Sequence, residues 1–159
     1  MPGLPKKFNS IVKTDGLWSA MRWLNDKVPY RFTAIFAFDG DRLRNICLVD
    51  KEDSNITHCP DQLITDSYCI YIQRSGARFS VEDSRLDARV NGHPKQSSFH
   101  CYYGIPLSGP SGKLLGTVCH FNSAPVRVTE DVVDSLDELA DVIVDAAFTP
   151  GESLTPPVH

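Results

Sequence analysis

Two pairs of adjacent cysteine and histidine residues are the features of this sequence that most resemble a catalytic or metal-binding site. His100 and Cys101 lie in "SSFHCYYGIPL" (97–107), and Cys119 and His120 lie in "TVCHF" (117–121). Thiolate and imidazole groups together can hold Zn²⁺, and an imidazole can activate a cysteine as a nucleophile. Both kinds of chemistry require the side chains to converge on one point.

The secondary structure expected for these segments separates the members of each pair. Both segments are apolar and aromatic and flank the turn-forming stretch "SGPSGK" (108–113), which predicts a β-hairpin with residues 107 and 114 opposite each other. Side chains alternate between the two faces of a strand, so Cys101 and His120 share one face. The other face carries His100, Tyr102, Cys119 and Phe121. The two pairs therefore cannot form one zinc site, and we expect no metal site.

Each face has a different expected role. We expect Cys101 to fill the core as a small apolar residue and His120 to be satisfied there by a hydrogen bond. On the other face an imidazole, a phenol and a thiol lie near an aromatic ring. That combination suits either ordinary packing or the wall of a pocket for a small polar ligand. The residues alone leave both alternatives open.

The composition of the chain is that of a soluble globular protein. Its 159 residues suit one domain, with 42% hydrophobic and 23% charged residues. A net charge of −4 without a dense lysine and arginine cluster argues against nucleic acid or a membrane surface as the main partner. No segment has the length and apolarity of a membrane span, and the five cysteines are thinly spread. We therefore expect a cytoplasmic protein with reduced thiols.

The order of the expected helices and strands predicts an α+β domain. Helical spacing is found over 17–29, and a hairpin turn is expected at Asp39-Gly40 between two β-like runs. A short helix over 65–76 ends at a glycine and is followed by a strand at 78–83. The clearest helix is expected over 130–148, after the hairpin described above. Tight turns between neighbouring strands make the sheet antiparallel, with the terminal helices on one face.

Three stretches of the chain resemble the GAF domain family in sequence and in order: "DSYCIYIQRSG", "RFSVEDSRLDAR" and "CYYGIPLSGPSGKLLGTVCHFNSAPVRVTEDVVDSLDELADVIV". The most telling part is the Tyr-x-Gly-Ile-Pro-Leu strand at 102–107. The resemblance covers 15–148 and implies the GAF fold, a central antiparallel sheet of five to six strands. The terminal helices pack on one face of that sheet, and a ligand pocket lies on the other. Residues 1–14 are then an N-terminal extension, and 149–159 are a disordered Pro-rich tail.

The resemblance also implies a function. GAF domains are small sensory modules that bind cyclic nucleotides, bilins, haem, metabolites or anions, so the cofactor or ligand stays unknown. We expect a regulatory domain without catalysis of its own that binds a small molecule and acts in trans on a signalling protein. A homodimer through the terminal helices is expected from the same resemblance. The residues assigned to the ligand pocket are Phe36, Cys69, Asp83, His100, Tyr102, Cys119 and Phe121. Asp83 has a second interpretation, as a salt-bridge partner that ties its loop to the sheet.

Two alternative functions stay open. The free methionine-R-sulfoxide reductases are stand-alone GAF proteins that use a thiol–disulfide relay, and Cys59 and Cys69 match the ten-residue spacing of two of their cysteines. Their third, catalytic cysteine would fall near His93, where this chain has none. Their pocket carboxylates would align with Tyr102, Cys119 and Phe121. The other alternative is a purely structural protein-interaction domain whose pocket is filled by its own side chains.

Overall fold

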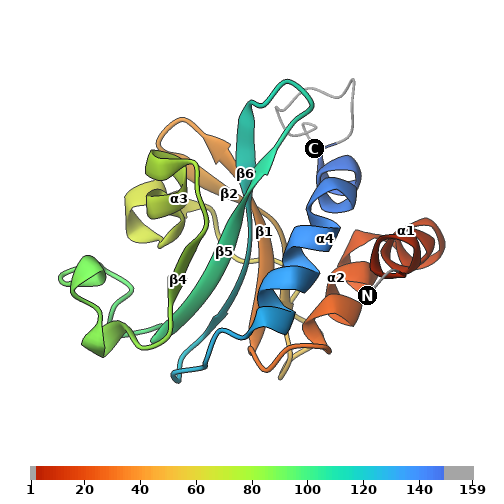
Figure 1. The fold of residues 1–159 in the computed structure, drawn as a ribbon. Coiled ribbons are helices and arrows are strands. Elements are labelled where there is room, and N and C mark those ends of the chain that lie inside the picture. Colours follow the sequence, from red (N-terminus) through yellow and green to blue (C-terminus); the bar gives the residue numbers. More distant parts are fainter. Residues whose placement is uncertain (1–2, 149–159) are drawn as a thin grey trace.

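A twisted antiparallel sheet forms the centre of the molecule (Figure 1). The computed structural model describes residues 3–148. Within that range six strands pair in the order β3-β2-β1-β6-β5-β4, and every neighbouring pair is antiparallel. The strands are β1 (Phe32–Asp39), β2 (Arg42–Asp50), β3 (Gln62–Leu63), β4 (Phe79–Val81), β5 (Cys101–Ser108) and β6 (Leu114–Asn122).

Helices cover the two faces of the sheet unequally. On one face lie α1 (Leu4–Asp15), α2 (Leu17–Asn25) and α4 (Glu130–Ala147). On the other face, α3 (Cys69–Ser75) packs against β5 and β6. The sequence predicted a helix in this segment, and the residues that α4 buries recur at helical spacing: Val132, Leu136, Leu139, Ile143 and Val144. The expected α+β architecture, with the terminal helices on one face of an antiparallel sheet, is confirmed.

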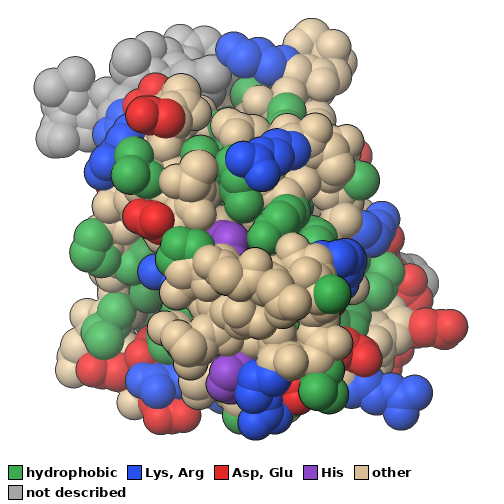
Figure 2. All heavy atoms as spheres, turned by 90° about the vertical axis from the view of Figure 1, so that its left-hand side faces the viewer, with side chains coloured by type: hydrophobic (Ala, Val, Ile, Leu, Met, Phe, Trp, Pro, Cys, Tyr) green, Lys and Arg blue, Asp and Glu red, His purple; other side chains and the backbone are tan. Residues whose placement is uncertain are grey.

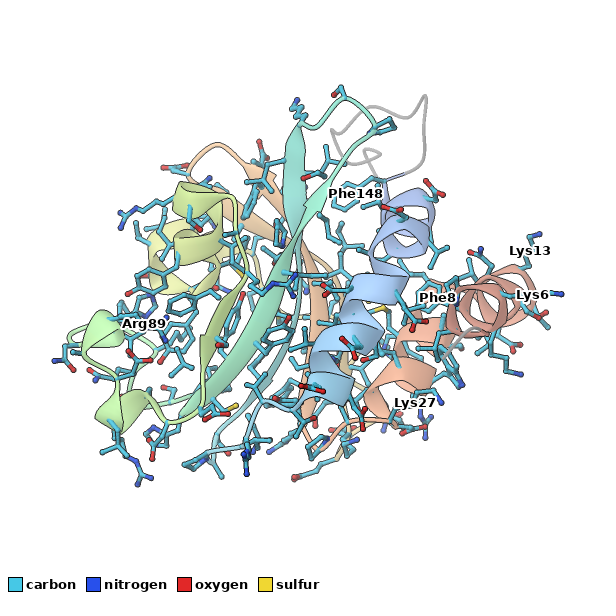
Figure 3. All side chains as sticks on the ribbon, viewed as in Figure 1. Lys6, Phe8, Lys13, Lys27, Arg89 and Phe148 are labelled. Carbon is cyan, nitrogen blue, oxygen red and sulfur yellow. The ribbon has the colours of Figure 1, made fainter. Side chains whose placement is uncertain are left out.

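The N-terminal segment belongs to this helical layer. The segment 1–14 was expected as an extension that precedes the domain; within it, residues 4–14 form most of α1, which packs against α2 and α4. Phe8 is fully buried in the same apolar cluster as the other terminal helices and lies on the side of α1 that faces α4 (Figure 3). The expected Pro-rich tail over 149–159 lies outside the described residues. Within 3–148, no helix has the length and apolarity needed to cross a membrane.

Two glycines with positive φ close turns that the sequence predicted. Gly40 has a φ of 60° between β1 and β2, and Gly76 has a φ of 68° directly after α3. Glycine adopts these angles without the steric cost of a Cβ atom. The N–H of Gly76 also donates to the carbonyl of Ile72, which ends the helix. Turn chemistry therefore located both the first hairpin and the end of the short helix correctly.

The register of the β5–β6 hairpin differs from the prediction by two residues. Tyr102 lies opposite Phe121, whereas the sequence analysis placed it opposite Cys119. Strand pairing extends one residue further than expected, to Ser108, and Leu115 forms a bulge that adds a second residue to the offset. Because an offset of two residues preserves the alternation, residues within both strands keep the face predicted for them.

Gly116 occupies a point where β6 and β1 approach too closely for a side chain, since a Cβ atom there would overlap the carbonyl oxygen of Phe36. We predict that Gly116→Ala lowers the free energy of unfolding by about 1–3 kcal/mol, because the β1 backbone must move. Urea denaturation measures this change. Gly109→Ala is the matched control, since its Cβ would meet nothing nearer than Leu115 at 3.4 Å. Equal unfolding free energies for the two variants would contradict the prediction.

Candidate functional site

The two faces of the sheet carry separate apolar clusters. On the helix face, Cys101 and Tyr103 pack with side chains of α1, α2 and α4. On the opposite face, Tyr102 and Cys119 pack with Cys69 of α3. Alternation along the strands therefore places neighbouring residues in different environments. The candidate site lies on the α3 face, where the strand residues predicted to form a pocket wall are found.

A small cavity lies between the α3 face of the sheet and the segments that cover it. Its volume for water-sized occupants is about 40 Å³, enough for a few water molecules. The lining residues are Phe36, Gln62, Ser67, Tyr68, Lys95, Phe99, Tyr102, Cys119 and Phe121. Figure 2 views this side of the molecule, where hydrophobic, basic and histidine side chains reach the surface in small separate patches.

Aromatic rings form most of the apolar wall. Phe32 and Phe121 stack with ring centroids 5.1 Å apart, and Phe99 packs edge-on against them at 5.9 and 5.0 Å. Tyr68 packs edge-on against Tyr102 at 5.5 Å. Stacked and edge-to-face contacts are favourable arrangements of aromatic rings. The wall that they form suits an apolar or aromatic ligand.

Three polar side chains also reach the cavity, those of Gln62, Ser67 and Lys95. Of the described residues that line it, Lys95 is the only charged one. Its half-buried side chain forms no hydrogen bond or ion pair with any residue in 3–148. The cavity therefore combines an apolar wall with one positive charge that has no counter-ion in this range, an arrangement that favours an anionic group.

A fully buried cluster of thiols and hydroxyls lies beside the cavity. Cys69 Sγ is 3.1 Å from Tyr102 Oη and 3.3 Å from Thr117 Oγ1, and it also interacts with the Cys119 thiol. Burial alone raises the pKa of Cys69, but hydrogen bonds, first among them that from Cys119, outweigh burial and bring the pKa below its ordinary value. Burial raises the pKa of Cys119 well above that value. Cys69 is therefore the thiol of this pair that loses its proton first.

Most of the residues that the sequence assigned to a pocket meet at this place. Phe36, Tyr102, Cys119 and Phe121 line the cavity, and Cys69 contacts the hydroxyl group of Tyr102 beside it. These five side chains come from α3 and from strands β1, β5 and β6. They converge because the three strands are neighbours in the sheet and α3 packs on the same face.

His100 and Asp83 were also assigned to the pocket, but the structure does not bring them to the cavity. Strand β5 begins at Cys101, so the alternation that placed His100 on the pocket face does not reach it; its Nδ1 lies 2.8 Å from Ser84 Oγ. Asp83 accepts hydrogen bonds from the Arg85 guanidinium at 2.9 and 2.8 Å, and this ion pair lowers the pKa of Asp83 to about 2. The geometry of Asp83 is that of a salt bridge within its own loop.

The sequence analysis did not assign Tyr68, Phe99 or Lys95 to the site. Tyr68 directly precedes α3, and its spacing of four residues from Ile72 places both on the buried side of that helix, so its position near the site could have been predicted. Phe99 and Lys95 belong to the irregular segment 91–100. This segment has no helical or strand-like hydrophobic pattern from which the positions of its side chains could be predicted. Contacts that are distant in the sequence help to set its path, including the hydrogen bond that Tyr68 Oη donates to the Phe99 carbonyl at 3.0 Å.

The two cysteines of the thiol-relay alternative belong to one apolar cluster, with Cys69 inside it and Cys59 packed against it. Cys59 is half-buried; burial, then the charges of Asp61 and Cys69, raise its pKa to about 11. His93 is in the segment where the resemblance would require a third cysteine, and its Nε2 lies 3.1 Å from the Ser67 carbonyl oxygen. No described residue of the cavity wall is a carboxylate that could bind the ammonium group of an amino-acid substrate.

Cys101 and His120 lie on the helix face, where each has a polar partner. Cys101 Sγ donates to the Val126 carbonyl at 3.1 Å, and His120 Nδ1 is 2.7 Å from Thr33 Oγ1. Both side chains are fully buried, and the His120 ring stacks on Tyr30 at 5.2 Å. Both residues lie in the core as expected, and Nδ1 of His120 has a hydrogen-bond partner, but the buried Nε2 of His120 has none among the described residues. Across residues 3–148, no three cysteine, histidine or acidic side chains meet as a metal-ligand set.

Solved structures with GAF domains superpose on most of the chain. The GAF domain of an Acinetobacter phosphoenolpyruvate-protein phosphotransferase has a TM-score of 0.71 at 12% identity, with 92% of each chain covered. A putative GAF sensor protein from Burkholderia vietnamiensis also has a TM-score of 0.71, at 16% identity and with 92% of each chain covered. Free methionine-R-sulfoxide reductase from Neisseria meningitidis, in complex with its substrate, has a TM-score of 0.70 at 15% identity. That alignment covers 91% of this chain and 86% of the reductase.

The chain therefore has the GAF fold, as the sequence resemblance predicted. No protein-family model and no curated protein matches the chain. At identities of 12–16%, the likeness to these structures extends to the fold and no further. One fold serves both a putative sensor and a reductase among them, so function has to be argued from the residues of the cavity.

His120 makes the stability of the folded protein depend on pH. Complete burial, with a smaller contribution from the charge of Lys51, lowers the pKa of His120 from 6.5 to about 3. Below pH 6.5, His120 is protonated in the unfolded chain but stays neutral in the folded protein. The free energy of unfolding therefore falls as the pH decreases. The loss approaches about 1.4 kcal/mol per pH unit, until the pH reaches the folded pKa.

We predict that the free energy of unfolding in urea falls between pH 6.5 and about 4.5, above the range where most carboxylates titrate. His120→Gln should flatten this slope, because glutamine takes up no proton in either state. His58→Gln is the control, since His58 is exposed and should leave the slope unchanged. Identical slopes for wild type and His120→Gln would show that His120 does not cause the pH dependence.

Proposed function

We propose that this GAF-fold domain binds a small molecule in the cavity on its α3 face and regulates a partner protein, without catalysing a reaction. The observation that carries the proposal is the aromatic wall of a cavity that Lys95 also lines, since the Lys95 side chain has no counter-ion within 3–148. Such a site suits a compact ligand with an apolar or aromatic body and one anionic group.

Binding of such a ligand requires the covering segment 91–100 to move. A cavity of about 40 Å³ holds a few water molecules, whereas pockets for organic ligands have volumes of about 300 Å³ or more. The segment consists of turns and bends, and its Lys95 and Phe99 are half-buried. An outward movement of Phe99 therefore opens the cavity without breaking any strand pairing. The ligand then replaces Phe99 against Phe32 and Phe121.

A thermal-shift screen with small aromatic and aliphatic carboxylates tests this function. We expect at least one compound to stabilise the fold, by about 2.7 kcal/mol at a hundred times its dissociation constant. Lys95→Gln should weaken the shift by removing the positive charge, and Cys119→Phe should abolish it by filling the cavity. Lys113→Gln is the matched control, because Lys113 is exposed in the turn between β5 and β6.

The screen should be repeated on protein refolded from urea, which removes carried-over molecules. If no compound then stabilises the fold, the proposal is contradicted. That result would instead support a protein-interaction domain whose pocket is filled by its own side chains. The small volume of the cavity favours this candidate.

Proximity of Cys59 and Cys69 favours one catalytic candidate, a thiol reductase acting on free methionine sulfoxide. The two groups interact electrostatically, and the Neisseria meningitidis reductase shares the fold. This candidate predicts thioredoxin-coupled NADPH consumption with free methionine sulfoxide and its loss in Cys69→Ser. Absence of turnover by the wild type would eliminate it. The proposed binding function predicts that absence, since the cavity wall carries Lys95 and no carboxylate among the described residues.

We further propose that the protein forms a homodimer through its terminal helices. Lys6 and Lys13 project outward from α1 (Figure 3), while α4 exposes an acidic row that includes Asp134, Asp141 and Asp145. Contact between α1 of one copy and α4 of the other pairs these opposite charges.

Light scattering should therefore give a dimer mass at low salt. The double variant Lys6→Glu, Lys13→Glu should be monomeric because of like-charge repulsion, and Lys113→Glu should remain dimeric because Lys113 lies in the β5–β6 turn. A monomeric wild type would contradict the homodimer.

A further inference from the structure

Four side chains with exchangeable protons meet where α3 packs on the sheet. Cys69 belongs to α3, Tyr102 to β5, and Thr117 and Cys119 to β6. The side chain of Cys69 is fully buried, as are those of both β6 residues. Its sulfur has the Tyr102 and Thr117 hydroxyl oxygens at 3.1 and 3.3 Å and interacts with the Cys119 thiol. The cluster therefore brings two thiols together away from bulk water.

The surroundings of the two sulfur atoms give them different chemistry. When Cys69 is a thiolate, it can only accept hydrogen bonds, so the hydroxyls of Tyr102 and Thr117 both donate to it. Burial raises the pKa of Cys69, but the Cys119 thiol, then the Ser67 hydroxyl, and then these two contacts hold it below its ordinary value. Cys119 lies beside that negative charge, and burial first, then Cys69, raises its pKa. Cys69 is therefore the nucleophile of the pair, and Cys119 stays protonated next to it.

The cavity provides access to this cluster for a very small molecule. Tyr102 and Cys119 both belong to its wall, and its volume of about 40 Å³ admits molecules similar in size to water. Cys69 itself does not line the cavity, but its sulfur lies directly behind the wall, 3.1 Å from the hydroxyl oxygen of the lining residue Tyr102. Cys47 and Cys101 are also buried, and neither lines the cavity. Within the described chain, the thiol pair thus combines a thiolate-stabilising environment with a path for a small reactant.

We propose that Cys69 and Cys119 form a redox pair, which a small hydroperoxide converts into an internal disulfide between α3 and β6. The inference goes beyond ligand binding, because it uses the thiols and not the charge of Lys95. A disulfide here joins the short helix that covers the α3 face to the central strand beneath it. The oxidised protein therefore has a covalent link across the wall of the cavity.

The reaction balances in two steps. The Cys69 thiolate attacks one oxygen of the hydroperoxide, the O–O bond breaks, and the departing alkoxide or hydroxide takes up the proton that the thiol released. Cys69 becomes a sulfenic acid and is oxidised by two electrons, which reduce the peroxide. The Cys119 sulfur then attacks the Cys69 sulfur, the S–O bond breaks, and hydroxide leaves with the Cys119 proton as water. Two thiols and one hydroperoxide thus give one disulfide, one alcohol or water molecule, and one further water molecule.

Peptide mapping of folded protein treated with hydrogen peroxide tests the inference. Free thiols are blocked with N-ethylmaleimide in denaturant after the peroxide has been removed, and the digest is analysed without reductant. We expect a linked pair of peptides that contain Cys69 and Cys119 and that separate on reduction.

Single variants distinguish this pair from other thiols. Cys119→Ala should abolish the linked peptide and leave a Cys69 sulfenic acid that dimedone labels, and Cys69→Ala should abolish both signals. Cys101→Ala is the matched control, since Cys101 is equally buried on the other face and should leave the link intact. Cys59→Ala should also leave it intact.

Three outcomes would overturn the inference. In the first, Cys69 and Cys119 are both blocked by N-ethylmaleimide after peroxide treatment of the folded wild type. In the second, Cys69 is linked to Cys59 instead. In the third, the Cys69–Cys119 link forms in urea but not in the folded protein. Circular dichroism, measured in parallel, establishes whether each sample is folded.

Discussion

Alternation of side chains along β5 and β6 is the constraint on which the rest of this structure depends. It sends Cys101 and His120 into the layer of terminal helices, while Tyr102, Cys119 and Phe121 face α3. A register change by an odd number of residues would reverse the faces of one of these strands relative to the other. If β6 were reversed, the buried imidazole would lie in the aromatic cavity, and the pocket thiol would lie under the helices. The cavity, the thiol cluster and the acid sensitivity of the core all follow from this one arrangement.

Much of the fold could be predicted from the sequence, because the signals that define it are local. Helical spacing located α2 and α4, and glycines with positive φ closed the first hairpin and ended α3. The register of β5 and β6 was wrong by two residues, since a bulge at Leu115 leaves no mark that periodicity can detect. The assignment of faces survived because the offset is even. The predicted face of each side chain was therefore more reliable than the predicted residue pairs across the hairpin.

The rest of the site could not be predicted, because it depends on irregular backbone. His100 lies one residue before β5 begins, so it contacts Ser84 instead of facing the cavity. Lys95 and Phe99 reach the cavity from a segment whose path is set by contacts distant in the sequence, such as that with Tyr68. These residues supply the positive charge and the part of the cover whose movement we propose for ligand entry. The chemical character of the proposed ligand thus became visible only in three dimensions.

Two kinds of chemistry meet at the same wall of the cavity. The aromatic rings and Lys95 suit an anionic ligand, while Cys69 and Cys119 suit thiol oxidation. A disulfide between α3 and β6 changes the wall that a ligand would touch. The redox state of the pair and the affinity for the ligand are then thermodynamically linked, each altering the other by the same factor. The proposed ligand binding and the proposed thiol oxidation would therefore share one site.

The central claim is that the cavity holds a small molecule, and native mass spectrometry of the protein purified from cells tests it most directly. The account predicts a non-covalent adduct of a small anion, released on denaturation and missing from Cys119→Phe, in which the larger side chain fills the cavity. A wild-type protein that carries no adduct, and that takes up none from a cellular extract of small molecules, would contradict it.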